Sequence, residues 1–386
     1  MITMPFVDNR KFRMIVERDF LFQSISNGAF SVDTFFFISG LLISYVYYKA
    51  EGGKMNRAEE TAASHAKASG MKFLGGVTYR IVRLTPPYLV VLVLTYLTGR
   101  WFYFNSVFES PVGDHFTCPR YWWRNVLYIN TLFPVNQMCM IWSWYLADDT
   151  QFYFLGLMIL LISSRYAKFA TFFTGILLAS SWVTTAIITL YTQHKPSIEE
   201  PLGLFDQLYD KPWTRLGPYI VGMAVGYYLA RINCKATYHK GVVTLGWILS
   251  MMTTFILVHG LYGELDQVES AAYVALSHTA WSLAVSWIVV ACVTGYGGPV
   301  NVILSSRLFA PFSRLSYCAY LIHPLIMLST LAHMDGATHL QRDTMVIAIF
   351  GYFFVSYLGS VILTILFEAP AVALLNIFHP LKKKMK

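Results

Sequence analysis

The sequence predicts an all-α fold, a polytopic bundle of membrane helices. Three observations indicate this class: 56% of the 386 residues are hydrophobic, only 13% are charged, and the mean hydropathy is +0.50. Soluble domains contain about 25% charged residues. This composition excludes a disordered chain and a small disulfide scaffold, and it argues strongly against a soluble two-domain enzyme.

Nine apolar segments approach or reach the length of about 20 residues that a membrane-spanning helix requires. The predicted helices cover residues 29–48, 85–104, 142–163, 169–191, 216–230, 241–262, 276–296, 315–333 and 345–367. The segment 216–230 is the shortest of them. The first and third segments contain acidic residues and are therefore the weakest by hydropathy.

Most of the 29 lysine and arginine residues fall on one side if the 49–84 connection is cytoplasmic. The positive-inside rule then predicts a cytoplasmic C-terminus. The net charge of +8 follows from this asymmetry, so no nucleic-acid partner is needed to explain it. We expect an external segment 1–28, a transmembrane domain 29–380 and a basic cytoplasmic tail 381–386. Nine spans leave a basic N-terminal segment outside, which is disfavoured.

The predicted external stretch 101–141 contains Cys118 and Cys139. In an oxidising compartment these residues can form a disulfide, and the alternative is two unrelated free thiols. The chain has no Cys-x-x-Cys spacing, so we predict no metal site.

Polar groups at bilayer depth are costly and therefore candidates for function. Asp33 lies near the start of the first predicted helix, where it either caps the helix or serves a site. Asp149 lies one turn into the third helix beside Asp148. His323 lies in the middle of a helix before Pro324, which frees a backbone carbonyl that the imidazole or a ligand can use.

Arg80 and Arg83 are three residues apart, just before Pro86-Pro87, and so share a helix face. They can bind a phosphate bidentately, or they can extend to lipid headgroups. By contrast, His259, His278 and His333 fall near predicted external helix ends, and we interpret them as interfacial.

Four stretches, read in order, carry a resemblance to a known family. Residues 31–40 match the pattern VDxFFxxSG, and residues 79–88 match RxxRLxPxY. Residues 144–153 match WxLxxExQFY, with Asp149 where many members have Glu. Residues 316–323 match SYxxYLxH. Glu368 belongs to a closing ExP pattern. Together they resemble the acyltransferase-3 family of integral membrane acyltransferases, and in particular its invertebrate "nose resistant to fluoxetine" branch.

The resemblance implies ten helices, the first carrying an Arg or Lys and, about ten residues later, a His that serves as base. This chain has no such helix before residue 29. We therefore expect a truncated or shortened chain that lacks the first helix of the family and the base on it.

The resemblance further implies transfer of an acyl group, other than amino-acyl, from cytoplasmic acyl-CoA to a hydroxyl of a lipid, sugar or small molecule, with no bound cofactor. Arg80 and Arg83 would bind the donor phosphates. Asp149 would orient the base, His323 would be a polar partner in the acceptor path, and Asp33 would orient neighbouring helices.

The alternative is a non-catalytic lipid or drug carrier with an inactive acyltransferase-like fold. In either case the partners are the lipid bilayer and a lipid or small molecule. The expected location is the plasma membrane or the endoplasmic reticulum.

Overall fold

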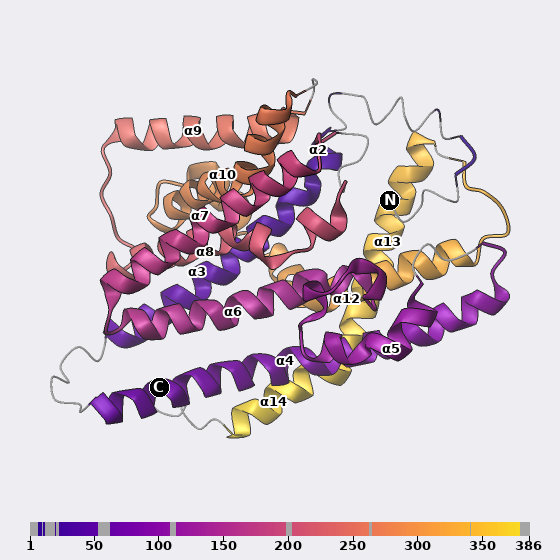
Figure 1. Cartoon of the computed structure of the whole chain (residues 1–386), viewed down its shortest axis with the longest axis horizontal. Coiled ribbons are helices and arrows are strands. Elements are labelled where there is room, and N and C mark those ends of the chain that lie inside the picture. Colours follow the sequence, from indigo (N-terminus) through magenta and orange to yellow (C-terminus); the bar gives the residue numbers. More distant parts are fainter. Residues whose placement is uncertain are drawn as a thin grey trace. The chain divides into compact units, whose positions relative to one another are not determined.

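The structure is a computed structural model that describes residues 7–9, 11, 20, 23–52, 62–108, 113–197, 203–261, 265–339 and 341–378. These residues form helices and connecting loops, and their β-structure is limited to an isolated bridge between Val7 and Thr338. The predicted all-α helical bundle is therefore confirmed (Figure 1).

Each of the nine predicted segments contains a helix. The long helices are α3 (Phe30–Gly52), α4 (Ala62–Asn105), α6 (Trp144–Ser163), α7 (Ala167–Tyr191), α8 (Pro212–Arg231), α9 (Lys240–His259), α10 (Gln267–Val293), α12 (Phe309–Ala332) and α13 (Arg342–Leu363). Shorter helices are α2 (Gln23–Ser26), α5 (Asp114–Val126), α11 (Gly298–Leu304) and α14 (Ala369–Phe378). Two π-helical turns occupy Phe205–Tyr209 and Thr364–Glu368.

Eight helical segments among the described residues are long and apolar enough to cross a membrane, and α8 is not among them. The α8 helix has twenty residues, of which twelve are buried, including Arg215. A helix that is enclosed by other helices contacts little lipid, so it tolerates a charge and several glycines that lower its hydropathy.

Helix α4 begins earlier than predicted. We expected the membrane helix to begin at residue 85, after the 49–84 connection, but α4 begins at Ala62 and continues through Pro86 and Pro87. Membrane helices tolerate such prolines because neighbouring groups satisfy the carbonyls that lose their N–H partners. Arg80 and Arg83 consequently lie within the helix and not before it.

The chain divides into two compact units, each described here by itself. The first consists of the described residues within Met1–Arg13, Leu74–Trp144 and Ser306–Lys386. The second consists of those within Met14–Phe73 and Tyr145–Ser305. In the second unit, α3, α7, α8, α9 and α10 lie together, with α8 packed against α3, α7 and α10 (Figure 1).

The close packing of α3 on α8 depends on glycines. A Cβ atom added at Gly222 of α8 would collide with the carbonyl oxygen of Phe37, and one at Gly226 would collide with that of Leu41. Small residues four apart are typical of membrane helices whose backbones touch. Because the contacts advance together along both helices, α3 and α8 run in the same direction.

Candidate functional site

The second unit contains a buried cluster of charged and titratable side chains around Asp33. This residue lies in the first turn of α3, and its carboxylate is fully buried. Arg215 of α8 donates from Nη1 to Oδ1 at 3.1 Å and to Oδ2 at 3.3 Å. Nδ1 of His278, on α10, lies 2.7 Å from Oδ2. Asp33 therefore joins three helices through one carboxylate.

The guanidinium of Arg215 has further partners, which is what a buried charge requires. Its Nε donates to the carbonyl of Tyr209 at 3.1 Å, and its central carbon lies 4.3 Å from the centre of the Tyr209 ring. A buried ion pair is tolerated when such hydrogen bonds complete its coordination. Only arginine offers several donors in a rigid fork, so lysine would not reproduce this arrangement.

The Nδ1 atom of His278 lies close to both a hydrogen-bond acceptor and a donor. Its Nδ1 lies 2.7 Å from Asp33 Oδ2 and 2.9 Å from Arg215 Nη1. If Nδ1 carried no proton, its lone pair would face a carboxylate lone pair at 2.7 Å. If Nδ1 is protonated, it donates to the carboxylate, a charge-assisted hydrogen bond. The Arg215 guanidinium, which can only donate, by contrast favours a lone pair on Nδ1.

A pocket adjoins this cluster within the second unit. Its lining combines aromatic and hydrogen-bonding groups, among them Asn27, Thr185, His194, Tyr209, Ser277 and His278. The cavity volume of about 90 Å³ exceeds the 10–15 Å³ or so that one water molecule needs, so a small polar group fits. Phe30, stacked on Trp281 at 5.3 Å between ring centres, packs against the His278 ring.

Sequence reasoning missed two members of this cluster. Arg215 was placed outside the membrane helix because we began that helix at Leu216, whereas α8 begins at Pro212. We expected His278 near an external helix end, whereas α10 begins at Gln267, so the residue lies well inside the helix, half-buried beside Asp33. The available signal was Asp266 and Glu269, a capping box that starts the helix nine residues before our prediction.

The remaining candidate in the second unit is Asp149. It is the sixth residue of α6, 8% exposed, and its neighbour Asp148 is completely buried. Neither carboxylate faces open solvent. The predicted role of Asp149 in orienting a base stays a prediction.

In the first unit, Arg83 belongs to a polar cluster with Glu368. Its Nη2 lies 3.5 Å from Glu368 Oε1, and the arginine side chain is 47% exposed whereas that of the glutamate is 8% exposed. The buried Cys318 donates from Sγ to Glu368 Oε2 at 3.4 Å. Glu368 ends the π-helical turn Thr364–Glu368, and such turns occur often at functional sites.

Arg80 lies on α4 one turn before Arg83 and is half-buried. The guanidinium of Arg83 is half-exposed and therefore accessible to an anion, and its pairing with Glu368 fixes its position. Both arginines belong to the same helix and the same unit, as their spacing predicted. Their binding of a phosphate stays a prediction.

His323 has a local structural contact on α12. Pro324 has no N–H, so the carbonyl of Tyr320 lacks its helical donor. The Nδ1 of His323 lies 2.8 Å from that carbonyl oxygen and 3.3 Å from that of Ala319. The imidazole thus uses the carbonyl that proline frees, which was one of the two uses we considered. A role of His323 toward an acceptor stays a prediction.

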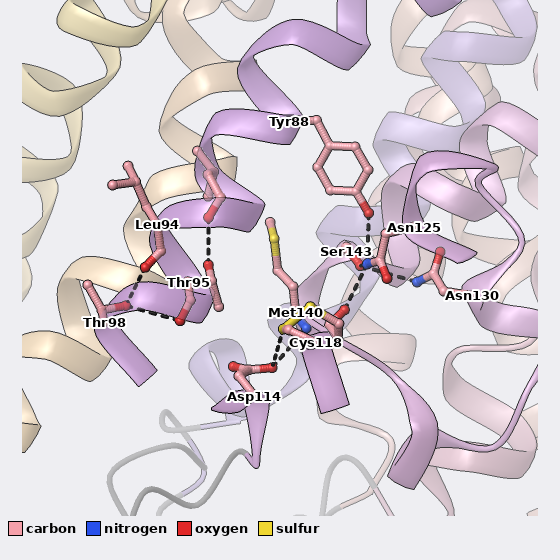
Figure 2. Close-up of a disulfide and its surroundings, with 12 residues drawn as sticks. Tyr88, Leu94, Thr95, Thr98, Asp114, Cys118, Asn125, Asn130, Met140 and Ser143 are labelled. Atoms are coloured by element: carbon pink, nitrogen blue, oxygen red, sulfur yellow. Dashed lines mark hydrogen bonds between the residues drawn. A yellow bond between two sulfur atoms is a disulfide. The ribbon is translucent and has the colours of Figure 1, made fainter. Parts of the chain in front are cut away.

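Cys118 and Cys139 form a disulfide in the first unit. Beside it, the carboxylate of Asp114 accepts a hydrogen bond from the Met140 N–H at 2.9 Å, as Figure 2 shows. Burial raises the pKa of Asp114 to about 6, although the Met140 hydrogen bond opposes this shift. Asp114, Cys118 and Cys139 are close enough to suggest a metal site. Both sulfurs, however, belong to the disulfide and are not thiolates.

A buried amide network adjoins the disulfide. Asn125 donates from Nδ2 toward the Tyr88 hydroxyl at 3.0 Å, the Cys139 carbonyl at 2.8 Å and the Ser143 hydroxyl at 3.0 Å (Figure 2). Asn130 donates to the same Ser143 hydroxyl at 3.1 Å. Since these contacts bond the two amide nitrogens and tie α5 to the 139–143 segment, the network stabilises the stretch that carries the disulfide.

A family model described as an acyltransferase domain matches residues 4–365, nearly the whole chain. The chain belongs to the acyltransferase-3 family. With its long apolar helices, this member of the family is an integral, multi-pass membrane protein.

Two curated relatives come from Caenorhabditis elegans. The chain is 30% identical to Nose resistant to fluoxetine protein 6 over 334 aligned residues. This alignment covers 80% of the chain and 40% of that protein. It is 22% identical over 385 residues to Regulator of hypoxia-inducible factor 1, covering 90% of the chain and 69% of that relative. The chain thus spans less than half the length of the first relative. No solved structure matches it significantly.

Proposed function

We propose that this acyltransferase-3 domain transfers an acyl group, other than amino-acyl, from cytoplasmic acyl-CoA to a hydroxyl of a lipid, sugar or small molecule. The observation that carries the proposal is the acyltransferase domain that extends over residues 4–365. The exposed guanidinium of Arg83 supports the donor assignment. Guanidinium groups bind phosphate oxygens bidentately, and acyl-CoA carries several phosphates.

The predicted topology places Arg80 and Arg83 toward the cytoplasm, where acyl-CoA is found. In the first unit, an apolar groove between α4 and α12 supplies a surface for an acyl chain. It is lined by Leu94, Thr98, Ile322, Leu325, Ile326, Ser329, Thr330 and His333, with a cavity volume of about 490 Å³.

Replacing Arg83 by alanine tests the donor site. Loss of a charge-assisted contact costs about 1.5–3 kcal/mol, so we expect palmitoyl-CoA to bind about 10- to 100-fold more weakly. Equilibrium binding of radiolabelled palmitoyl-CoA to the full chain in nanodiscs measures this. The single variant leaves the buried Glu368 carboxylate without its arginine partner. The double variant Arg83→Ala with Glu368→Gln replaces that carboxylate by a neutral amide.

The matched control is Arg100→Ala on the same helix. Arg100 is exposed, and among the described residues it bonds only the Tyr96 hydroxyl four residues away. Unchanged palmitoyl-CoA affinity in both Arg83 variants would contradict the donor assignment. Equal weakening by Arg100→Ala would reduce the effect to general surface charge.

The second candidate function is a carrier that binds a lipid without chemistry, which the same apolar groove favours. Release of free CoA separates the two candidates, because only transfer breaks the thioester. Palmitoyl-CoA or lipid that binds without any CoA release, with glycerol, glucose and 1-oleoylglycerol each offered as acceptor, supports the carrier.

A further inference from the structure

In the first unit, helix α5 runs back alongside α4. A Cβ atom added at Gly99 of α4 would lie 3.7 Å from the Cβ atom of Asp114, the first residue of α5. Near the other end of α5, the amide of Asn125 donates to the Tyr88 hydroxyl at 3.0 Å (Figure 2). Since the contacts move back along α4 as α5 advances, the two helices are antiparallel neighbours.

These contacts define how far α5 reaches along α4. Gly99 and Tyr88 lie about three turns apart, which is about 16 Å along the helix axis. The exposed rings of Trp101 and Tyr103 mark the membrane interface just beyond Gly99, because such side chains gather at headgroup level. The hydrocarbon core is about 30 Å thick, so the end of α5 lies near its middle.

We propose that residues 114–143 form a re-entrant arm, which enters the membrane from the side on which α4 ends and turns back near the middle of the bilayer. The outer face of this arm contacts lipid hydrocarbon. From the sequence we expected an external stretch over residues 101–141, so the inference moves most of these residues into the membrane. It does not rest on the proposed acyltransferase function.

The chain turns back after α5 and returns to the first turns of that helix. Cys139 is bonded to Cys118, which lies four residues after Asp114. The N–H of Met140 donates to the Asp114 carboxylate at 2.9 Å. The returning segment is therefore tied to the part of α5 that lies closest to the membrane boundary.

The side chains of the arm are distributed as contact with lipid requires. Large apolar side chains that are 49–61% exposed lie on its outside, among them Phe116, Trp122, Leu127 and Leu132. Polar side chains that are at most 1% exposed lie inside, among them Asn125, Asn130, Thr131 and Ser143. A loop surrounded by water is expected to turn such polar groups outward and such apolar groups inward.

The backbone of the turn after α5 forms its own hydrogen bonds. The N–H of Tyr128 donates to the Asn125 carbonyl and that of Ile129 to the Arg124 carbonyl, each at 3.0 Å. The N–H of Leu132 donates to the Ile129 carbonyl at 3.1 Å. Irregular backbone at membrane depth is tolerated where protein groups satisfy it in this way.

The two arginines of α5 are compatible with this position. The guanidinium carbon of Arg124 lies 3.8 Å from the centre of the Phe133 ring and 4.3 Å from that of Tyr121. Its Nη1 donates to Gln137 Oε1 at 3.0 Å, so polar and aromatic partners surround the buried charge. Arg120 is exposed one turn closer to the boundary, and a side chain of this length can extend to the headgroups.

The tip of the arm lies beside the polar part of α4. The hydroxyls of Tyr128 and Thr85 are 3.0 Å apart, and the Tyr317 hydroxyl of α12 donates to the Leu84 carbonyl at 2.6 Å. Thr85 follows Arg83 by two residues. The arm thus ends next to the part of α4 that carries Arg83.

Nitroxide accessibility in the full chain, reconstituted in phosphatidylcholine nanodiscs, measures the depth of the arm. The free cysteines Cys234, Cys292 and Cys318 are replaced by alanine. A maleimide nitroxide then labels Leu127→Cys near the tip and leaves the native disulfide intact. We expect oxygen, which partitions into hydrocarbon, to relax this label more strongly than the water-soluble nickel complex Ni-EDDA. Leu132→Cys, at an exposed position after the turn, gives an independent reading.

Two labelled positions on or near α4 calibrate the measurement. Val93→Cys, exposed in the apolar part of α4, is the lipid reference, and Val107→Cys, exposed beyond the end of α4, is the water reference. The ratio of oxygen to nickel accessibility at Leu127 should approach that at Val93 and exceed that at Val107 severalfold. Phe116→Cys, closer to the membrane boundary, should give an intermediate ratio.

A charged substitution tests the same surface without a label. Leu127→Arg should lower the melting temperature by about 5 °C or more, because an arginine that faces hydrocarbon is costly. The matched control is Val107→Arg, which should leave the melting temperature nearly unchanged.

Three results would overturn the re-entrant arm. Labels at Leu127 and Leu132 with the nickel accessibility of Val107 would place the turn in water. Labels shielded from both reagents would show that protein, and not lipid, covers the outer face. A melting temperature of Leu127→Arg equal to that of the wild type would likewise show that this side chain does not face hydrocarbon.

Discussion

Replacing Asp114 by asparagine should change the pH dependence of stability in a direction that the structure fixes. Asp114 is 4% exposed at the first position of α5. Burial raises its pKa from 3.8 to about 6, and the Met140 N–H, which favours the carboxylate, offsets this only in part. Asparagine keeps an oxygen to accept from Met140 but never becomes charged.

The sign follows from proton linkage. Below pH 3.8 both folded and unfolded chains hold the proton. Between pH 3.8 and 6 the unfolded chain releases it first, so stability falls as the pH rises through this window and stays lower above it. A shift of about two units corresponds to about 3 kcal/mol at 1.36 kcal/mol per unit.

The assay compares wild type with Asp114→Asn in detergent from pH 4 to 7.5 by denaturant or thermal unfolding. We expect the variant to gain stability relative to wild type as the pH rises, by about 3 kcal/mol over the range. Asp335→Asn, at an exposed loop residue of the same unit, should show no such trend. A stability difference for Asp114→Asn that does not change with pH would refute the reasoning.

Two other predictions concern packing and the disulfide. Gly222→Val should destabilise the second unit by about 3 kcal/mol or more, because its side chain collides with the backbone carbonyl of Phe37. Gly175→Val, at a glycine that faces open space, should leave the melting temperature nearly unchanged. Converting Cys118 and Cys139 together to serine should cost about 3 kcal/mol for a loop of this length. That loss should appear as a lower melting temperature that reducing agent no longer affects, and an unaltered melting temperature would contradict it.

The helices could be predicted from the sequence because hydropathy acts locally. A run of about 20 apolar residues is sufficient to identify a span, whatever it packs against. The predicted helix boundaries were wrong where a charged residue lies inside a helix. Our predicted helix at α8 began only after Arg215, because an unpaired arginine inside the membrane is costly. Its partner Asp33 lies 182 residues away, so no local pattern shows that the charge is paired.

The cluster itself could be predicted only in part for the same reason. Asp33 was identified as an acid at bilayer depth, but its partners come from α8 and α10, which only the fold brings to it. For His278, the sequence did contain a signal in Asp266 and Glu269, which start α10 before the apolar run. Hydropathy alone places a helix start at the first apolar residue and therefore too late when a polar first turn precedes it.

Helix packing and the buried cluster are physically one feature. Gly222 and Gly226 let the backbone of α8 approach that of α3, and the same approach brings Arg215 to within 3.1 Å of Asp33. An ion pair of this kind tolerates little displacement, because a buried carboxylate without its partner costs several kcal/mol. A side chain at Gly222 would therefore separate Arg215 from Asp33 as well as the helices, and the orientation of His278 would be lost with them. The glycines of α8 are thus as necessary to the buried cluster as the ion pair that they bring together.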